Sequence, residues 1–179
     1  NEIFADPTPS IGLPGYEYLE LYNTTNTAIN ITDWSITIGT TEKTFPPSII
    51  EPDSFIILVK EDVLDSFPSN ISKIGFSSIS LTNGGGDVVL KDEKGTTINA
   101  ISYTDKWYND ENKNDGGWSI ERGNPNLFCE GKNNWRASVS NIGGTPGKQN
   151  SVFGETLFIE EFRITKAIII DSNKVQVQD

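Results

Sequence analysis

The sequence contains no histidine and no methionine, and it has a single cysteine, Cys129. Without histidine, the chain cannot build a Ser-His-Asp triad or a histidine metal site, and Cys129 lacks the base that a cysteine nucleophile usually needs. One cysteine also cannot form an intrachain disulfide or a thiolate metal cluster. We therefore interpret Cys129 as a small buried hydrophobic residue and expect the protein not to be an enzyme.

Long apolar runs are also missing. No stretch approaches the roughly 20 apolar residues that a membrane-spanning helix needs, so membrane insertion is not expected. No signal peptide is visible. Because methionine is absent, we expect Asn1 to be a processed or truncated N terminus, and a removed leader would account for it.

Basic residues are scarce. The chain has 14 lysines and arginines against 25 acidic residues, which gives a formal net charge of −11. Nucleic-acid binding normally rests on lysine and arginine side chains that neutralise phosphates. We therefore expect neither nucleic acid nor an anionic membrane surface as a partner. The charge suits a soluble extracellular protein, and we expect it in the secreted fraction or the cell envelope, exposed at the surface.

Short apolar segments dominate the sequence, and most have the usual length of a strand, about 5 to 7 residues. In residues 16–23, Leu19 and Leu21 alternate with Tyr18, Glu20 and Tyr22, which predicts a strand with two different faces. The expected strands are 2–5, 16–23, 34–39, 55–59, 87–90, 97–103, 118–122 and 135–138.

The predicted turns and the scarcity of predicted helix agree with a fold of many short strands. Residues 92–95 predict a hairpin turn between two of the strands, and only residues 61–67 favour one or two helical turns. Many short strands with polar, glycine- and proline-rich connections are typical of a β-sandwich or a β-barrel. Trp34 and Trp135 are expected to pack in the core.

A boundary follows the stretch Gly143-Gly144-Thr145-Pro146-Gly147. We expect one domain over residues 1–152, and residues 153–179 as a C-terminal β extension or the start of a truncated next domain. Residues 156–164 alternate like a strand, but this tail is too short to bury a core of its own. It is expected to dock on the first domain or on a second copy, so the protein would be a monomer or a weak strand-mediated dimer.

Several motifs occur in an order that matches one known family. They are Asn1-Glu2-Ile3, Tyr18-Leu19-Glu20-Leu21-Tyr22-Asn23, Ile31-Thr32-Asp33-Trp34-Ser35-Ile36, Phe45-Pro46-Pro47, Leu81-Thr82-Asn83-Gly84, Gly86-Asp87-Val88-Val89-Leu90, the stretch from Asp92 to Gly95, Trp118-Ser119-Ile120-Glu121-Arg122, Asn134-Trp135 and Gly144-Thr145-Pro146-Gly147 with Asn150. Over about residues 1–152 the chain resembles the bacterial branch of the lamin tail domain.

This resemblance implies an all-β, immunoglobulin-like β-sandwich, here with an additional C-terminal strand segment. Bacterial domains of this kind accompany secreted or envelope proteins as accessory modules. The family has no shared catalytic residues, and no cofactor is expected. The chain has no heptad rod, so the filament role of nuclear lamins does not carry over.

The loop 105–117 is the most suggestive candidate site. Asp110, Asn112 and Asn114 alternate like the start of a calcium loop, but Asp115 occupies the sixth position, where glycine is needed. We interpret the loop as a solvated polar connection without metal, while calcium in a different geometry stays open.

Aromatic and acidic pairs offer further candidates. If Trp107 and Tyr108 are exposed, they could stack on a sugar or grip a protein partner; otherwise they cap the end of the sandwich. The acidic pairs, Glu17 with Glu20 and Glu160 with Glu161, could be glycosidase carboxylates, but we expect them mostly to face solvent.

Two functions follow from these patterns. We favour a non-catalytic module that spaces, tethers or docks parts of a larger surface protein, with other domains of that protein or a surface protein as partners. The alternative is a ligand-binding module for carbohydrate or for calcium-dependent adhesion.

Overall fold

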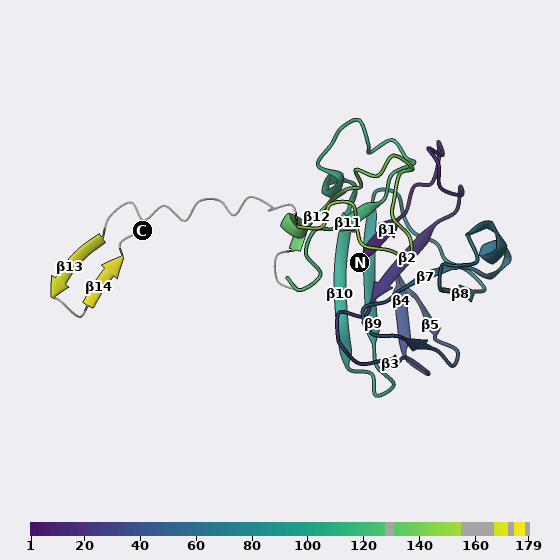
Figure 1. The fold of residues 1–179 in the computed structure, drawn as a ribbon, viewed down its shortest axis with the longest axis horizontal. Helices are drawn as coiled ribbons and strands as arrows, with labels where there is room; N and C mark the ends of the chain where they lie inside the picture. The colour runs from purple at the N-terminus through teal and green to yellow at the C-terminus, as the bar shows by residue number, and fades with distance from the viewer. Residues whose placement is uncertain (128–130, 155–166, 172–173, 178–179) are drawn as a thin grey trace.

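The computed structural model describes residues 1–127, 131–154, 167–171 and 174–177. Two sheets pack face to face as a β-sandwich (Figure 1). The six-stranded sheet has the order β12-β11-β1-β2-β7-β8, and the four-stranded sheet has the order β10-β9-β4-β5. Their bounds are β1 Glu2–Phe4, β2 Tyr18–Tyr22, β4 Ser35–Ile38, β5 Thr41–Thr44, β7 Phe55–Lys60, β8 Lys73–Phe76, β9 Gly85–Lys91, β10 Thr97–Thr104, β11 Ile120–Arg122 and β12 Trp135–Ala137.

The remaining elements are short. Strand β3 (Ile29–Asn30) pairs with β6 (Ile49–Ile50), and β13 (Ala167–Asp171) pairs with β14 (Lys174–Val177). Three 3-10 helices are η1 (Glu61–Ser66), η2 (Asp105–Tyr108) and η3 (Gly131–Asn134). The expected all-β sandwich is therefore confirmed, and η1 lies where residues 61–67 favour helical turns, whereas η2 and η3 were not expected.

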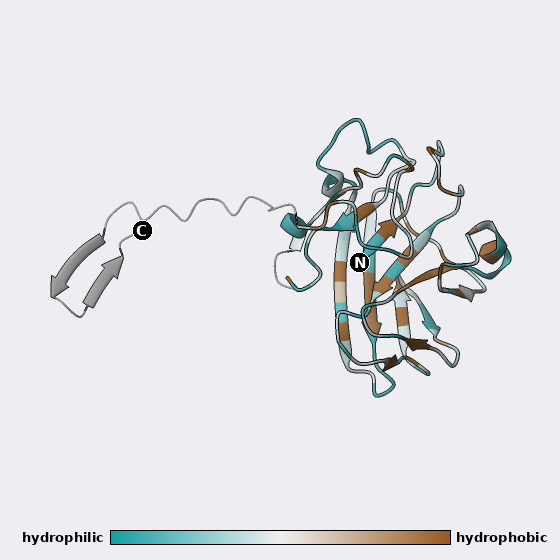
Figure 2. Cartoon of the chain, viewed as in Figure 1, coloured by the Kyte–Doolittle hydropathy of each residue, from teal (hydrophilic) through white to brown (hydrophobic). Residues whose placement is uncertain are grey.

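The main core lies between the two sheets. Leu19 of β2, Ile36 of β4 and Val88 of β9 are buried in it, because alternate residues of each strand point to the same side. Apolar residues, drawn in brown, recur along the strands of both sheets in Figure 2. Trp135 is 2 % exposed and belongs to this core, whereas Trp34 packs against it while remaining partly exposed.

The outer face of the six-stranded sheet is also covered. Tyr18 of β2 and Ile57 of β7 are fully buried there, under Leu13 of a long loop and Val63 of η1. A sheet buried on both faces needs apolar residues at consecutive positions, which is why β7 reads as a continuous apolar run. The sequence pattern of β2 indicated two different faces, but both of them are buried.

The hairpin between β9 and β10 forms where residues 92–95 predict it. Asp92 Oδ1 accepts hydrogen bonds from the main-chain nitrogens of Lys94 (2.9 Å) and Thr96 (2.7 Å). At the start of β9, Gly85 has a φ of +132°, and a Cβ there would lie 2.4 Å from the carbonyl oxygen of Tyr103. Glycine is therefore required at this position, where β9 begins opposite the end of β10.

Some expectations fall on residues that the structure does not describe. Cys129 and the segment 156–164 lie outside the described residues, so the burial of Cys129 and the docking of the tail stay predictions. The division into residues 1–152 and 153–179 also stays a prediction. Within the described part of the chain, no helix combines the length and hydrophobicity needed to cross a bilayer.

Candidate functional site

Three glutamates lie side by side on adjacent strands of the six-stranded sheet. Glu2 of β1 pairs in register with Glu20 of β2 on one side and with Glu121 of β11 on the other. Their exposed fractions are 0 %, 2 % and 0 %. The expectation that Glu20 faces solvent is therefore wrong. Glu17 is partly buried as well, and its Oε2 accepts a hydrogen bond from the Leu81 nitrogen (3.0 Å).

The glutamate cluster (Glu2, Glu20 and Glu121) is covered by a C-terminal strap, residues 143–154. Glu2 Oε1 accepts a hydrogen bond from the main-chain nitrogen of Thr145 at 2.8 Å. Glu20 Oε2 accepts one from the nitrogen of Gly147 at 2.6 Å. Each of the two strands thus fixes a different residue of the strap.

Glu121 binds the later part of the strap. Its Oε2 accepts hydrogen bonds from Ser151 Oγ (2.7 Å) and from the Val152 nitrogen (3.2 Å), and Val152 is fully buried. Asn150 adds two contacts of its own, because its Nδ2 donates to the carbonyl oxygens of Asn1 and Arg122 at 2.9 Å each. The strap is therefore attached to three strands by buried and partly buried hydrogen bonds, which are costly to break.

Close approach of the strap needs glycine at position 144. A Cβ on Gly144 would lie 2.7 Å from both Glu2 Oε1 and the hydroxyl oxygen of Tyr18. That hydroxyl and Ser119 Oγ each donate to Glu2 Oε1 at 2.6 Å. Gly144 thus lets the main chain pass directly over a carboxyl group that is fully surrounded by the protein.

Burial changes the acidity of the cluster. Loss of solvation and the nearby charge of Glu121 raise the pKa of Glu2 from 4.5 to about 7, although hydrogen bonds from Ser119 and Tyr18 oppose the shift. Loss of solvation and the charge of Glu2 raise the pKa of Glu20 to about 8. Perturbed carboxyl groups often mark catalytic sites, but these oxygens bind the protein's own strap. We therefore interpret the cluster as structural.

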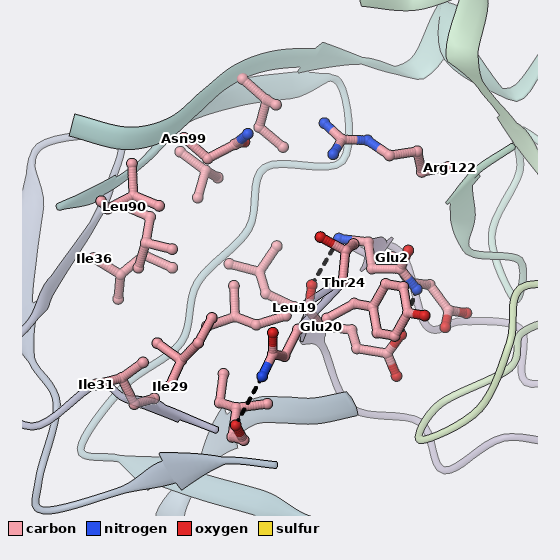
Figure 3. A pocket seen from close by; sticks show the side chains of 18 of the residues that line it. Glu2, Leu19, Glu20, Thr24, Ile29, Ile31, Ile36, Leu90, Asn99 and Arg122 are labelled. Atoms are coloured by element: carbon pink, nitrogen blue, oxygen red, sulfur yellow. Dashed lines mark hydrogen bonds between the residues drawn. The ribbon is translucent and has the colours of Figure 1, made fainter. Parts of the chain in front are cut away.

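A cavity of about 300 Å³ lies between the two sheets, on the other side of β2 from the strap. Its walls are mainly aliphatic, with Leu19 from one sheet and Ile36 and Leu90 from the other (Figure 3). Asn99 of β10 and Arg122 of β11 contribute polar groups, and Figure 3 shows the Arg122 side chain extending into the space. Apolar cavities with a few placed polar groups are the usual form of a binding site.

Arg122 is 8 % exposed and contacts an aromatic side chain. Its guanidinium carbon lies 4.9 Å from the ring centroid of Trp135, close enough for a cation–π interaction. Burial lowers the pKa of Arg122. The cavity therefore has a cationic group held against one of its walls.

Trp107 and Tyr108 do not form the exposed patch that sugar or protein binding requires. Trp107 is 9 % exposed and stacks on Trp135 at a centroid distance of 5.5 Å. Tyr108 is 3 % exposed, and its hydroxyl donates to the carbonyl oxygen of Trp118 at 3.1 Å. Because both side chains fill the end of the sandwich, the structure supports the capping interpretation.

The loop 105–117 is held by its own polar side chains. Asp110 Oδ1 accepts hydrogen bonds from the main-chain and side-chain nitrogens of Asn112, at 3.0 Å and 3.2 Å, while Asn114 and Asp115 are exposed. Lys113 Nζ donates to the carbonyl oxygen of Ser138 (2.7 Å). Across the described residues, no group of three or more histidine, cysteine or acidic residues is placed to hold a metal ion.

Comparison with known families agrees with this architecture. Residues 1–105 match the family model described as Lamin Tail Domain. The chain belongs to the lamin tail domain family. No curated protein matches the sequence significantly.

The lamin tail domain is an immunoglobulin-like protein-interaction module without enzymatic activity. A non-catalytic accessory role is therefore compatible with the family. The lamin tail domain of this protein extends beyond the matched residues, because β11 pairs with β1 and β12 pairs with β11 in the same sheet. Its membership of the bacterial branch stays a prediction.

Sequence reasoning did not identify the glutamate cluster or the cavity. A signal for the cluster does exist: each of the three glutamates lies next to an isoleucine or leucine within a predicted strand. Charged residues among apolar strand positions are ordinary on a half-exposed sheet, so this signal gains meaning only once the register of the three strands is known.

Proposed function

We propose that this lamin tail domain is a non-catalytic docking and spacing module of a larger secreted or cell-surface protein, and that it docks extended peptide segments along strand β10. The family supports a protein-interaction role. The acidic composition and the resemblance to bacterial accessory domains support the extracellular setting. The choice of docking surface rests on one observation, which is the long and uncharged edge strand of the four-stranded sheet.

Strand β10 is the last strand at one side of the four-stranded sheet, and it is eight residues long. It contains no charged residue and no proline, and Ile98 is 49 % exposed. Proteins usually protect long edge strands with charges, prolines or short length, because an edge presents unpaired main-chain groups to other chains. An uncharged edge of this length suits strand addition by a partner.

The other edges of the two large sheets are protected. Strand β5 has four residues, two of which are Glu42 and Lys43. Strand β12 has only three residues, and β8 lies against η1, where a Cβ on Gly75 would meet the Cα of Glu61 at 2.9 Å. Of the four edges of the two large sheets, β10 is therefore the one best suited to bind an extended segment.

The test is a selection of unstructured displayed peptides for binding to the protein. Ala100 is exposed on β10, and Ala100→Lys adds a charge to the edge without changing the core. We expect this variant to bind the selected peptides at least roughly tenfold more weakly. Thr41→Lys places the same charge on the opposite edge, β5, and should leave binding unchanged.

Two results would overturn the proposal. The selection could enrich no peptide, or the enriched peptides could bind the Ala100→Lys variant as tightly as the unchanged protein. The extracellular setting needs a separate measurement. A protease added to intact source cells or to their culture medium should reach the parent protein, and full protection in both fractions would exclude that setting.

A further inference from the structure

The cavity between the sheets lies along the inner side of β10. Asn99 and Ile101 of that strand line it, and Arg122 and Trp135 line it from the opposite sheet. The four-stranded sheet is narrower than the six-stranded sheet that it covers, and β10 is its outermost strand on this side. A strand added next to β10 would continue the narrower sheet, so that every second side chain would point between the sheets.

We propose that the cavity receives alternate side chains of the partner segment that pairs with β10, and that this segment carries aliphatic side chains and one carboxylate that binds Arg122. The inference rests on the proposed docking at β10 and names the chemistry of the partner. Main-chain pairing supplies the attachment, and the side chains in the cavity supply the selectivity.

The aliphatic requirement follows from the cavity walls. Ile36, Leu90 and Ile101 present methyl groups to the space, and Leu21 and Ile29 are only partly buried around it. Aliphatic side chains that enter the cavity would remove from water both their own apolar surface and the apolar surface of the cavity walls, which is favourable. Polar side chains would lose their hydration there without gaining matching partners.

The single carboxylate follows from charge. Arg122 lines the cavity, and a guanidinium group binds a carboxylate with two parallel hydrogen bonds. The chain as a whole carries a formal charge of −11, so a strongly acidic partner would be repelled over most of the surface. A mostly neutral segment with one acidic side chain at the depth of Arg122 fits both conditions.

The probe is a set of synthetic peptides of eight residues, the length of β10. Threonine and isoleucine alternate in each peptide, and a glutamate replaces one isoleucine at a different position in each. We expect calorimetry to detect one tightest-binding peptide. Its glutamine version should bind roughly tenfold more weakly, and so should its version with alanine in place of isoleucine. A peptide of the same composition in scrambled order should not bind.

Protein variants separate the two proposals. Ile101→Trp fills the cavity from β10 and should weaken the tightest peptide, while Arg122→Gln should make the glutamate and glutamine peptides bind equally. Because the peptide changes leave the protein untouched, the test holds even if one of these variants fails to fold. Ala100→Lys tests docking at the edge of β10, and the glutamine version of the peptide shows whether the added charge acts through the carboxylate.

The outcomes are distinct. If Ala100→Lys abolishes binding but the alanine and glutamine peptides bind as tightly as their parent, docking at β10 stands and the cavity inference is wrong. If the peptides bind the Ala100→Lys variant equally well, the proposed docking itself is wrong. If decanoate binds the cavity and the peptides do not, the cavity takes a small amphiphile, which also overturns the inference.

Discussion

Glu2 and Glu121 lie opposite each other on β1 and β11, and a single threonine hydroxyl contacts both carboxyl groups. Thr145 Oγ1 is 2.9 Å from Glu121 Oε1 and 3.5 Å from Glu2 Oε2. One hydroxyl proton can be donated to only one of the two acceptors. Burial and the nearby Glu121 raise the pKa of Glu2 to about 7, and protonation of Glu2 relieves the repulsion between the two carboxyl groups beneath the strap.

Stability is predicted to fall as the pH rises. Glu2 and Glu20 have pKa values raised to about 7 and about 8 in the folded protein, above the ordinary 4.5. Burial lowers the pKa of the Asn1 amino group from 8.0 to about 5, which acts in the opposite direction. Between about pH 4.5 and pH 7 the two glutamates outweigh it, so the folded state binds more protons than the unfolded chain and the free energy of unfolding decreases over that range. Thermal melting across this range should show a steadily decreasing Tm.

Glu2→Gln is the matched control for this pH dependence. Glutamine keeps an oxygen that can accept from Tyr18, Ser119 and the Thr145 nitrogen, and it removes the ionisation. Its melting temperature should depend less on pH than that of the unchanged protein. An equally steep pH dependence in the variant would show that Glu2 is not a source of the effect.

Gly144→Ala is predicted to destabilise the protein by about 1 to 3 kcal/mol, as other overpacked sites do. The added methyl group would meet Glu2 Oε1 and the Tyr18 hydroxyl, both at 2.7 Å, inside a fully buried region. Gly84→Ala is the control, because its Cβ would meet no atom within 4 Å. Chemical denaturation compares the two, and equal stabilities would mean that the strap does not pack as tightly as described.

The two core tryptophans are predicted to differ. Trp135 is 2 % exposed and stacks on Trp107, so Trp135→Ala should cost about 3 to 5 kcal/mol. Trp34 is only partly buried beside the cavity, so Trp34→Ala should cost less. Chemical denaturation of both variants provides the comparison. If Trp34→Ala is the more damaging change, the cavity is better packed than the structure indicates.

Calcium is predicted not to bind the loop 105–117. Asp110 already accepts two hydrogen bonds from Asn112, and the ammonium group of Lys113 lies within the same loop, 4.2 Å from the Trp118 ring centroid. The positive charge of Lys113 opposes the binding of a calcium ion in the same loop. Calorimetric titration with calcium should show no saturable site of micromolar affinity. Such a site, abolished by Asp110→Ala, would reverse this interpretation.

The local pattern of the sequence determined the all-β fold and the positions of most strands of the two large sheets, whereas β5 and β8, together with the short β3 and β6, were not expected. Alternation around Leu19 and Ile36 predicts strands whose inward residues share a core, and Asp92 marks a hairpin turn that its own side chain closes. These features depend on residues a few positions apart. The strand period of two and the turn chemistry are therefore visible without any knowledge of the fold.

Tertiary structure alone decided what covers each face. The alternation in β2 places Tyr18 and Glu20 on the side opposite Leu19, but it cannot show that the strap from residues 143–154 buries that side. The same limit applies to Trp107, whose burial depends on Trp135. Local sequence reports how side chains are divided between two faces, whereas burial, raised pKa values and the cavity arise from segments brought together from distant parts of the chain.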